Sequence, residues 1–336
     1  MKIDELKQLV EQSYGLEVIE LEKIKNVYRI KTSDDDYCLK VIKYEFPHFW
    51  FIVGAIKHLQ SKGFDRVPEI IKTKEGKDYV SIDELNAYLT KWISARECNY
   101  DNPLDVSLAA VKLAELHNKS EGFMVTETMK PRVYWYKWPE NFRTRMEEIL
   151  DFKKKIALKT EKTDFDYLFL SEMNKELSRA ERAVENLLES SYMEKISDDI
   201  VKSGFCHHDY AHHNVLIEER GSVNIIDFDY CILDTNLHDL ASLLIRKMKN
   251  GKWDIENAVH ILDSYDSVRK IERRDVGIMA AFMEFPQDYW QLGIQYYWEG
   301  PLKSEDFFVK KLNKIYEDRE EKQEFIEEFR NFKYGH

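Results

Sequence analysis

Glycine is scarce in this sequence, with 12 residues among 336, which is about half of the usual ~7%. A fold that cradles phosphate groups in glycine-rich loops would therefore have few glycines to use. Positive charge is also limited, because 50 Lys and Arg residues stand against 62 Asp and Glu residues, giving a net charge of −12. This balance disfavours a large basic face, so we predict no nucleic-acid partner.

Long apolar runs and paired cysteines are missing as well. The densest apolar run, residues 49–56, is well under half of the ~20 residues that a membrane-spanning helix needs. The N-terminal MKIDELKQLVEQ is charged and has no apolar core, unlike a signal peptide. We therefore expect synthesis in the cytoplasm and no membrane partner. The four cysteines are dispersed and form no Cys-x-x-Cys pair, which predicts reduced thiols.

The length predicts about two domains, and the hydrophobic pattern changes character along the chain. The first ~95 residues favour a small sheet crossed by a helix. We expect helices over 1–14 and 49–62 and strands over 18–21, 27–31, 37–42, 67–71, 77–82 and 85–93.

From residue 103 onward the pattern becomes mostly helical, apart from a loop and strands around 204–229. We expect helices over 104–118, over 141–194 with a break at 160–166, and within 237–332. The predicted fold class is α+β, with a small β-rich N-lobe at 1–93 and a large, mostly helical C-lobe at 94–336. A helical insertion at about 124–198 would wall the substrate site.

The largest cluster of potentially catalytic side chains lies in a loop that carries Asp209 and Asn214 and leads into a short strand. A tight hairpin then returns the chain to Asp227, so these three side chains are expected to meet at one end of a two-stranded ribbon. Carboxylate and amide oxygens suit Mg²⁺. Phosphoryl transfer needs such a metal and a carboxylate that orients the attacking hydroxyl. Each residue also has a plainer interpretation as turn or cap chemistry.

This pattern resembles the aminoglycoside and choline kinase-like phosphotransferases. Their loop reads H-G-D-x-x-x-x-N, followed by I-D-[FW] and later by Asp-Leu, and here His208 replaces the glycine. The resemblance implies a bilobal protein-kinase-like fold that uses ATP and Mg²⁺. It assigns catalysis to Asp209 and metal binding to Asn214 and Asp227. We expect His207 to anchor the catalytic loop and Asp239 to brace it.

A kinase of this kind also needs a nucleotide-binding lysine and a hinge. Lys40 alternates with Leu39 and Val41 along the strand at 37–42, so it can face a cleft and contact the ATP phosphates. The segment Lys91-Trp92-Ile93 lies where the lobes would meet, and its backbone is expected to bond the adenine.

A closer resemblance is to the CotS-type spore coat proteins. It rests on the hinge segment 88–98, the helix at 51–59, and the C-terminal segments 285–290 and 296–297, and it spans about 15 to 320. This family resemblance implies a protein of endospore-forming bacteria, made in the mother cell and associated with the spore coat. Other coat proteins then join the nucleotide and a hydroxyl-bearing small molecule as expected partners.

Two departures from the kinase pattern support an alternative. No glycine lies between residues 16 and 36, where kinases cover the phosphates, so we expect Asn26 to form the tight turn. The helix at 49–60 has no acid to pair with Lys40, and Glu45 is the substitute we consider. Both losses favour a weak or inactive pseudokinase that serves as a structural coat component.

Other interpretations stay open at this point. The histidines at 207, 208, 212 and 213 could bind zinc, although they lack a second Cys/His cluster. The aromatic run at 134–138 could stack a substrate ring or simply pack. Asp229 could join the metal site or cap a turn. The acceptor hydroxyl is not identified by any motif, and the acidic composition is only a weak indication of a cationic substrate.

Overall fold

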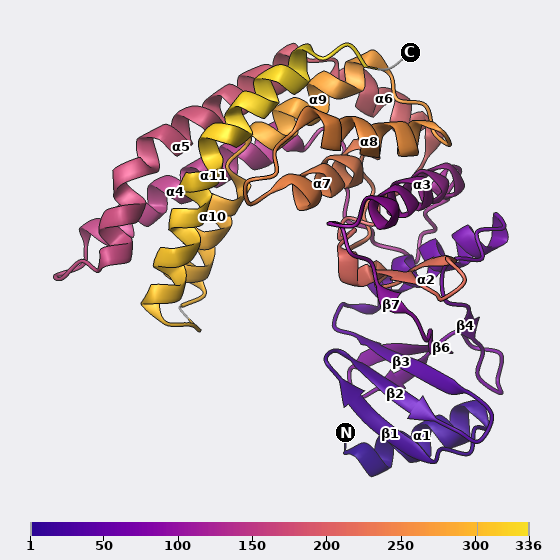
Figure 1. Ribbon diagram of the computed structural model, residues 1–336. Coiled ribbons are helices and arrows are strands. Elements are labelled where there is room, and N and C mark those ends of the chain that lie inside the picture. The colour runs from indigo at the N-terminus through magenta and orange to yellow at the C-terminus, as the bar shows by residue number, and fades with distance from the viewer. Residues whose placement is uncertain (1, 301, 335–336) are drawn as a thin grey trace. The chain divides into compact units, whose positions relative to one another are not determined.

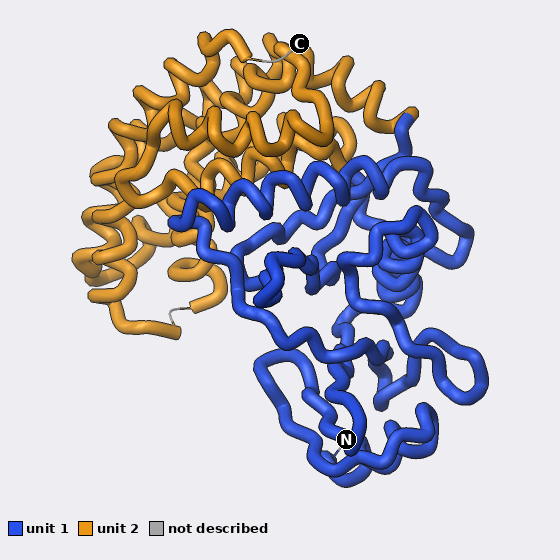
Figure 2. The backbone as a smooth tube through the Cα atoms, turned by 45° about the vertical axis from the view of Figure 1, so that its right-hand side comes forward, with its two compact units in different colours: residues 1–133, 202–233 blue, residues 134–201, 234–336 orange. Residues whose placement is uncertain are grey.

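The computed structural model describes residues 2–300 and 302–334. It is an α+β chain that divides into two compact units, residues 1–133 with 202–233 and residues 134–201 with 234–336 (Figure 2). The predicted N-lobe, 1–93, is contained in the first unit, and the lobe boundary after residue 93 stays a prediction. Among the helices that the structure describes, none is both long and apolar enough to cross a membrane.

The first unit contains a six-stranded antiparallel sheet (Figure 1). The strands run in the order β1-β2-β3-β6-β4, and β5 also pairs with β6. Their bounds are β1 (Glu20–Ile24), β2 (Val27–Lys31), β3 (Asp36–Ile42), β4 (Ile70–Ile71), β5 (Val80–Ile82) and β6 (Leu85–Lys91). The six expected strands are therefore present, although three of them are shorter than the sequence pattern suggested.

Helices cover this sheet because their apolar residues recur at helical spacing. Helix α1 (Ile3–Tyr14) buries Leu6 and Val10 against sheet residues that include Ile30 and Leu39. Helix α2 (Phe46–Ser61) begins three residues before the expected start, because Pro47 occupies its first turn, where a missing N–H is harmless. It ends at Ser61, with Lys62 as its C-cap residue, and α3 (Pro103–Ser120) follows the sheet.

A second, three-stranded sheet in the first unit has the order β7-β8-β9. The predicted hairpin is present as β8 (Val215–Ile217) and β9 (Val223–Ile225), with Gly221 at a φ of 83° in the turn. Strand β7 (Arg96–Glu97) was not predicted, because two exposed charged residues carry no alternating pattern.

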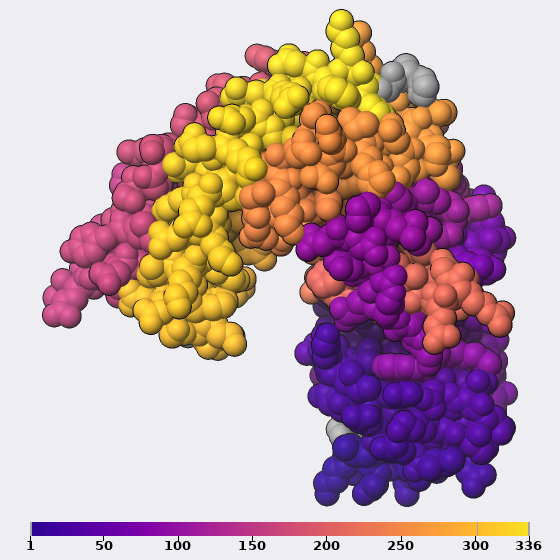
Figure 3. All heavy atoms as spheres, in the orientation of Figure 1, coloured from indigo at the N-terminus to yellow at the C-terminus, as the bar shows by residue number. Residues whose placement is uncertain are grey.

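The second unit is helical and has an aromatic core. Its helices are α4 (Trp138–Ala157), α5 (Asp164–Glu189), α6 (Tyr192–Lys202), α7 (Leu237–Met248), α8 (Ile255–Asp266), α9 (Arg273–Glu284), α10 (Gln287–Gly293), a π-turn η3 (Ile294–Trp298) and α11 (Glu305–Asn331). Phe152, Phe165, Phe169 and Tyr289 are fully buried in this core. One side of α11 is exposed, and its atoms are visible along the surface of this unit in Figure 3 (yellow).

The aromatic run at 134–138 ends in a packing residue. Trp138 is 2% exposed and stacks on Tyr192 with ring centroids 5.1 Å apart. Its Nε1 donates a hydrogen bond to Asp234 Oδ2 at 2.9 Å. This tryptophan is held inside the unit and does not offer a free face for a substrate ring.

Candidate active site

The end of the β8–β9 hairpin joins the residues that the sequence singled out. Val215 pairs with Ile225, and the Ile226 amide donates to the Asn214 carbonyl at 3.0 Å. The Ile226 carbonyl lies 2.9 Å from His207 Nε2. Ile226, which precedes Asp227, is therefore hydrogen-bonded to both His207 and Asn214, as the predicted convergence requires.

His207 holds the loop from a fully buried position. Because Nε2 faces a carbonyl, that nitrogen carries the proton, and Nδ1 accepts from the Asp209 amide at 3.3 Å. The imidazole also packs against Phe228, with ring centroids 4.8 Å apart. These contacts fit the anchoring role expected for His207.

Asp209 and Asn214 are in direct contact. Asn214 Nδ2 donates to the Asp209 carbonyl at 3.0 Å and lies 3.2 Å from Asp209 Oδ2. Asn214 is 2% exposed, in the short 3₁₀ turn η1 (His212–Asn214). Since its amide nitrogen is used by Asp209, the Oδ1 of Asn214 is the atom suited to a metal.

Two residues of the site adopt left-handed backbone conformations. His208 has a φ of 67°, which explains why related loops place glycine at this position. Asp227 has a φ of 67° and a ψ of 67° just before the 3₁₀ turn η2 (Phe228–Tyr230). Such non-glycine conformations are uncommon and concentrate at functional sites.

Lys40 reaches the same region from the centre of β3. It is 7% exposed, and its Nζ lies 2.6 Å from Asp227 Oδ1 and 3.1 Å from Asp229 Oδ1. The expectation that Glu45 would replace the missing helix acid is wrong. Glu45 instead precedes the first turn of α2, where its carbonyl accepts the amides of His48 and Phe49.

The three charges of this cluster perturb one another. Burial alone would lower the pKa of Lys40, but the two neighbouring carboxylates outweigh it and raise that pKa. Burial would likewise raise the pKa of Asp227, but Lys40 holds it below its usual value. For Asp229, burial dominates and raises the pKa to about 6.

The residues present fit a hard divalent cation. Two partly buried carboxylates share one lysine, and within residues 2–300 and 302–334 neither Asp227 Oδ1 nor Asp229 Oδ1 has a hydrogen bond of good geometry. A site with one surplus negative charge and unsatisfied oxygens suits Mg²⁺, which prefers oxygen ligands. Asp227 and Asn214 are the candidate ligands, and Asp229 is a third.

The expected hinge is partly occupied by the protein itself. Lys91 Nζ lies 2.7 Å from Asp35, and the Trp92 amide donates to the Asp36 carbonyl at 2.8 Å. The Trp92 ring is covered by the guanidinium of Arg29 at 4.9 Å. The Trp92 amide could therefore donate to adenine only if its hydrogen bond to the Asp36 carbonyl broke. The predicted adenine contacts are then left to the Trp92 carbonyl and the backbone of Ile93.

The turn above the expected phosphate site is shorter than a kinase loop. Strands β1 and β2 pair up to Ile24 and Val27, leaving Lys25 and Asn26 as the turn. The expected use of a left-handed asparagine is wrong, because the positive φ, 52°, belongs to Lys25. A two-residue turn has little backbone with which to cover a nucleotide.

Arg132 also lies in this region, although no sequence motif singles it out. Its Nη2 donates to the Asp229 carbonyl at 3.1 Å. Its guanidinium lies 5.4 Å from the Tyr44 ring and 5.7 Å from the Tyr230 ring. This sandwich holds the backbone that follows Asp227, across 97 residues of sequence.

The comparisons with known proteins agree with this geometry. The family model described as "Spore coat putative kinase YutH" matches residues 7–329. The chain belongs to this family. The match confirms the resemblance to CotS-type spore coat proteins over nearly the whole chain.

Solved structures of phosphotransferases share the fold. An aminoglycoside phosphotransferase from Alicyclobacillus acidocaldarius is 22% identical with a TM-score of 0.82, over 96% of this chain and 95% of that chain. AMP-bound spectinomycin phosphotransferase APH(9)-Ia is 18% identical with a TM-score of 0.70, over 97% and 98%. An amicoumacin kinase complex with AMP-PNP and Ca²⁺ is 13% identical with a TM-score of 0.64, over 99% and 96%. These likenesses confirm the predicted kinase-like α+β fold.

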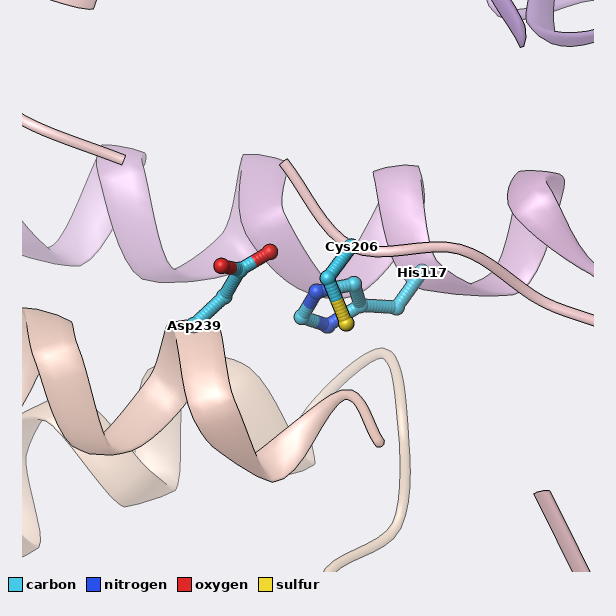
Figure 4. Close-up of side chains that lie close together, drawn as sticks. All are labelled: His117, Cys206 and Asp239. Atoms are coloured by element: carbon cyan, nitrogen blue, oxygen red, sulfur yellow. The ribbon is translucent and has the colours of Figure 1, made fainter. Parts of the chain in front are cut away.

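The histidines that could bind zinc do not gather with other ligands in the part of the chain that the structure describes. There, no group of three candidate ligand atoms within 4.8 Å of one another includes His207, His208, His212 or His213. His117 and Cys206, both buried in the first unit, do lie close together (Figure 4). All four cysteines are free thiols, as expected.

Asp239 lies on α7 of the second unit and is fully buried. Its Oδ1 is 3.4 Å from Nδ1 of the adjacent His238. The expected bracing of the catalytic loop by Asp239 stays a prediction.

Proposed function

We propose that the protein is an ATP- and Mg²⁺-dependent phosphotransferase that acts on a hydroxyl group of a small molecule. The observation that carries this proposal is the continuous set of contacts from Asn214 and Asp209, through the Ile226 backbone, to Asp227 and Lys40. This set combines a carboxylate, an amide, a second carboxylate and a lysine, which are the groups that phosphoryl transfer requires.

In the proposed reaction, the acceptor oxygen forms a bond to the γ-phosphorus while the bond from that phosphorus to the β,γ-bridging oxygen breaks. ADP leaves, and the hydroxyl proton passes towards Asp209. Asn214 orients Asp209 through its Nδ2 hydrogen bonds, and His207 fixes the loop backbone. Lys40 would exchange its carboxylate partners for the α- and β-phosphates of the nucleotide.

Mg²⁺, when bound by Asn214 and Asp227, would supply positive charge against the charge that develops on the phosphoryl oxygens. The hinge role of Lys91, Trp92 and Ile93 belongs to the same proposal, with the Trp92 amide excluded while it bonds Asp36. Asp239 is proposed as a support and not as a ligand. Most of the rate enhancement would come from positioning and electrostatics.

A second candidate function is a structural coat protein with weak or no catalysis. Two observations favour it: the two-residue turn at Lys25–Asn26 and the absence of an acidic residue within α2 (Phe46–Ser61). The family name places relatives in the spore coat. We propose the same location for this chain after synthesis in the mother cell, with other coat proteins as possible contacts for either function.

Phosphate release in a single turnover separates the two functions. With enzyme in excess over Mg-ATP and water as acceptor, the wild type should release phosphate. Asp209→Asn should reduce the rate by about 100-fold or more, the scale of a general base, while leaving the free energy of unfolding nearly unchanged. Asp65→Asn, whose side chain is 81% exposed, is the matched control.

Two outcomes would contradict the proposal. If millimolar Mg-ATP does not raise the melting temperature of the wild type, the structural coat function is favoured over the phosphotransferase. If Asp209→Asn releases phosphate at the wild-type rate, Asp209 does not have the proposed role, whatever the protein's activity.

A further inference from the structure

A cavity of about 500 Å³ lies entirely within the helical second unit. It is formed by α5, the turn after α7, α10 with the π-turn η3, and α11; α10 and α11 run side by side in Figure 1. Seven of its lining side chains are lysine or arginine, and three are acidic. This local excess of positive charge stands out in a chain with a net charge of −12.

Arg179 of α5 is the buried cation of this cavity. It is 6% exposed, and its Nη1 donates to Glu176 Oε2 at 3.0 Å. Its Nε and Nη2 are buried and, among the residues the structure describes, have no hydrogen-bond partner. A guanidinium offers five N–H donors, and a buried donor without a hydrogen bond destabilises the folded protein. An acceptor group bound in the cavity could therefore form the missing hydrogen bonds.

Two of the three acids are already bonded by the protein. Glu176 lies between Arg179 and Arg319, whose Nη1 is 3.3 Å from Glu176 Oε1. Asp318 accepts from the Gly251 amide at 2.6 Å and from Trp253 Nε1 at 2.8 Å. Among the described residues, Asp288 makes no such ion pair or hydrogen bond, so its carboxylate is the one acid left to offset part of the charge of the remaining cations.

The lysines of the cavity lack such partners. Within the described ranges, no ion pair forms at Lys249, Lys310, Lys314 or Lys322. Lys310 and Lys314 are exposed neighbours four residues apart on α11, a spacing at which like charges destabilise a helix. Burial lowers the pKa of Lys322 to about 8, with Arg179 adding to the effect. Repulsion among these positive charges lowers the stability of the helical unit, and a bound anion would reduce that repulsion.

We propose that this cavity binds a small molecule with clustered negative charge, carried by phosphate or carboxylate groups. Its volume is that of a small-molecule site, for which ~300–1,000 Å³ is usual. Exposed Phe307 and the side chains of Gln291 and Gln295 add an apolar surface and neutral donors to the cations. The proposal goes beyond the phosphotransferase function and does not depend on it.

Calorimetric titration of the full chain with pyrophosphate, and separately with citrate, tests the proposal and distinguishes phosphate from carboxylate ligands. Lys310→Gln/Lys314→Gln should weaken binding by about tenfold or more, equivalent to ~1.4 kcal/mol, and Arg179→Gln should abolish it. The double variant changes only exposed residues, so it remains informative if the Arg179 variant fails to fold.

Two controls locate the binding. Lys153→Gln/Lys154→Gln on α4 removes the same charge from exposed positions away from the cavity and should bind like the wild type. Lys40→Met should also bind normally, because Lys40 belongs to the nucleotide site of the first unit. Retained binding by the α11 double variant, or loss of binding in Lys40→Met alone, would overturn the proposal. Failure to bind either anion at millimolar concentration would also overturn the proposal. Binding of a hexaglutamate peptide without binding of either small anion would overturn it too, and would indicate a protein partner.

Discussion

Asp229 is the residue through which the electrostatics of the candidate active site can be tested without a substrate. Burial raises the pKa of its carboxyl from 3.8 to about 6, although Lys40 lies 3.1 Å away. The folded state therefore holds the Asp229 proton more tightly than the unfolded state. Stability contributed by this proton is present at low pH and is lost as pH rises through about 6.

The magnitude follows from the two pKa values. Each tenfold change in proton affinity is worth about 1.4 kcal/mol. Ionised Asp229 thus lowers the free energy of unfolding by about 3 kcal/mol at neutral pH, relative to a carboxyl with the same pKa in both states. Asp229→Asn should remove this penalty and make the metal-free protein more stable at about pH 7.5.

Urea unfolding in EDTA at about pH 7.5 and about pH 5.5 measures the effect. The stability advantage of Asp229→Asn over wild type should shrink by about 1 kcal/mol at the lower pH, because Asp229 then takes up its proton. Asp34→Asn, in an exposed turn, is the matched control. A variant less stable than wild type at about pH 7.5, or a stability difference that does not change with pH, would show that the pKa of Asp229 is not raised in the folded protein.

Three further substitutions test local features by urea unfolding. His208→Gly should raise the free energy of unfolding by up to about 1 kcal/mol, since φ is 67° there; a decrease would mean that imidazole contacts outweigh the backbone strain. Gly293→Ala should destabilise by about 2 kcal/mol or more, because the new Cβ would lie 2.5 Å from the Phe152 ring, and a neutral result would show that the ring can move. Arg132→Lys should cost about 1–2 kcal/mol through the bond to the Asp229 carbonyl and the lost ring stacking; unchanged stability would argue that this contact is dispensable.

The parts of the site that could be predicted are those encoded in short spacing. Asn214 and Asp227 flank a hairpin, so strand pairing alone brings them to one end of it. The anchoring by His207 also follows from its position two residues before Asp209. Lys40 could be chosen because the kinase-like pattern needs a lysine on a strand of the small sheet, and Lys40 lies on β3.

The unpredicted parts depend on packing between distant segments. Arg132 reaches Asp229 because its carbonyl accepts a hydrogen bond from the Leu233 amide, which holds the two segments side by side, and nothing in its sequence neighbours indicates this. The partner of Lys40 depends on which acid comes close in space, and this acid is Asp227 instead of Glu45. The anion cavity joins α5 to α11, more than 100 residues apart, so no local pattern could reveal it.

Calorimetric titration of ATP into the purified full chain, with and without Mg²⁺, measures whether the protein has the proposed nucleotide site. We expect saturable binding with Mg²⁺, weaker binding in EDTA, and a loss of about tenfold or more in affinity, ~1.4 kcal/mol, in Lys40→Met. Absence of binding at millimolar Mg-ATP, or equal affinity in Lys40→Met, would contradict the claim that Lys40 and the carboxylates beside it form a nucleotide site.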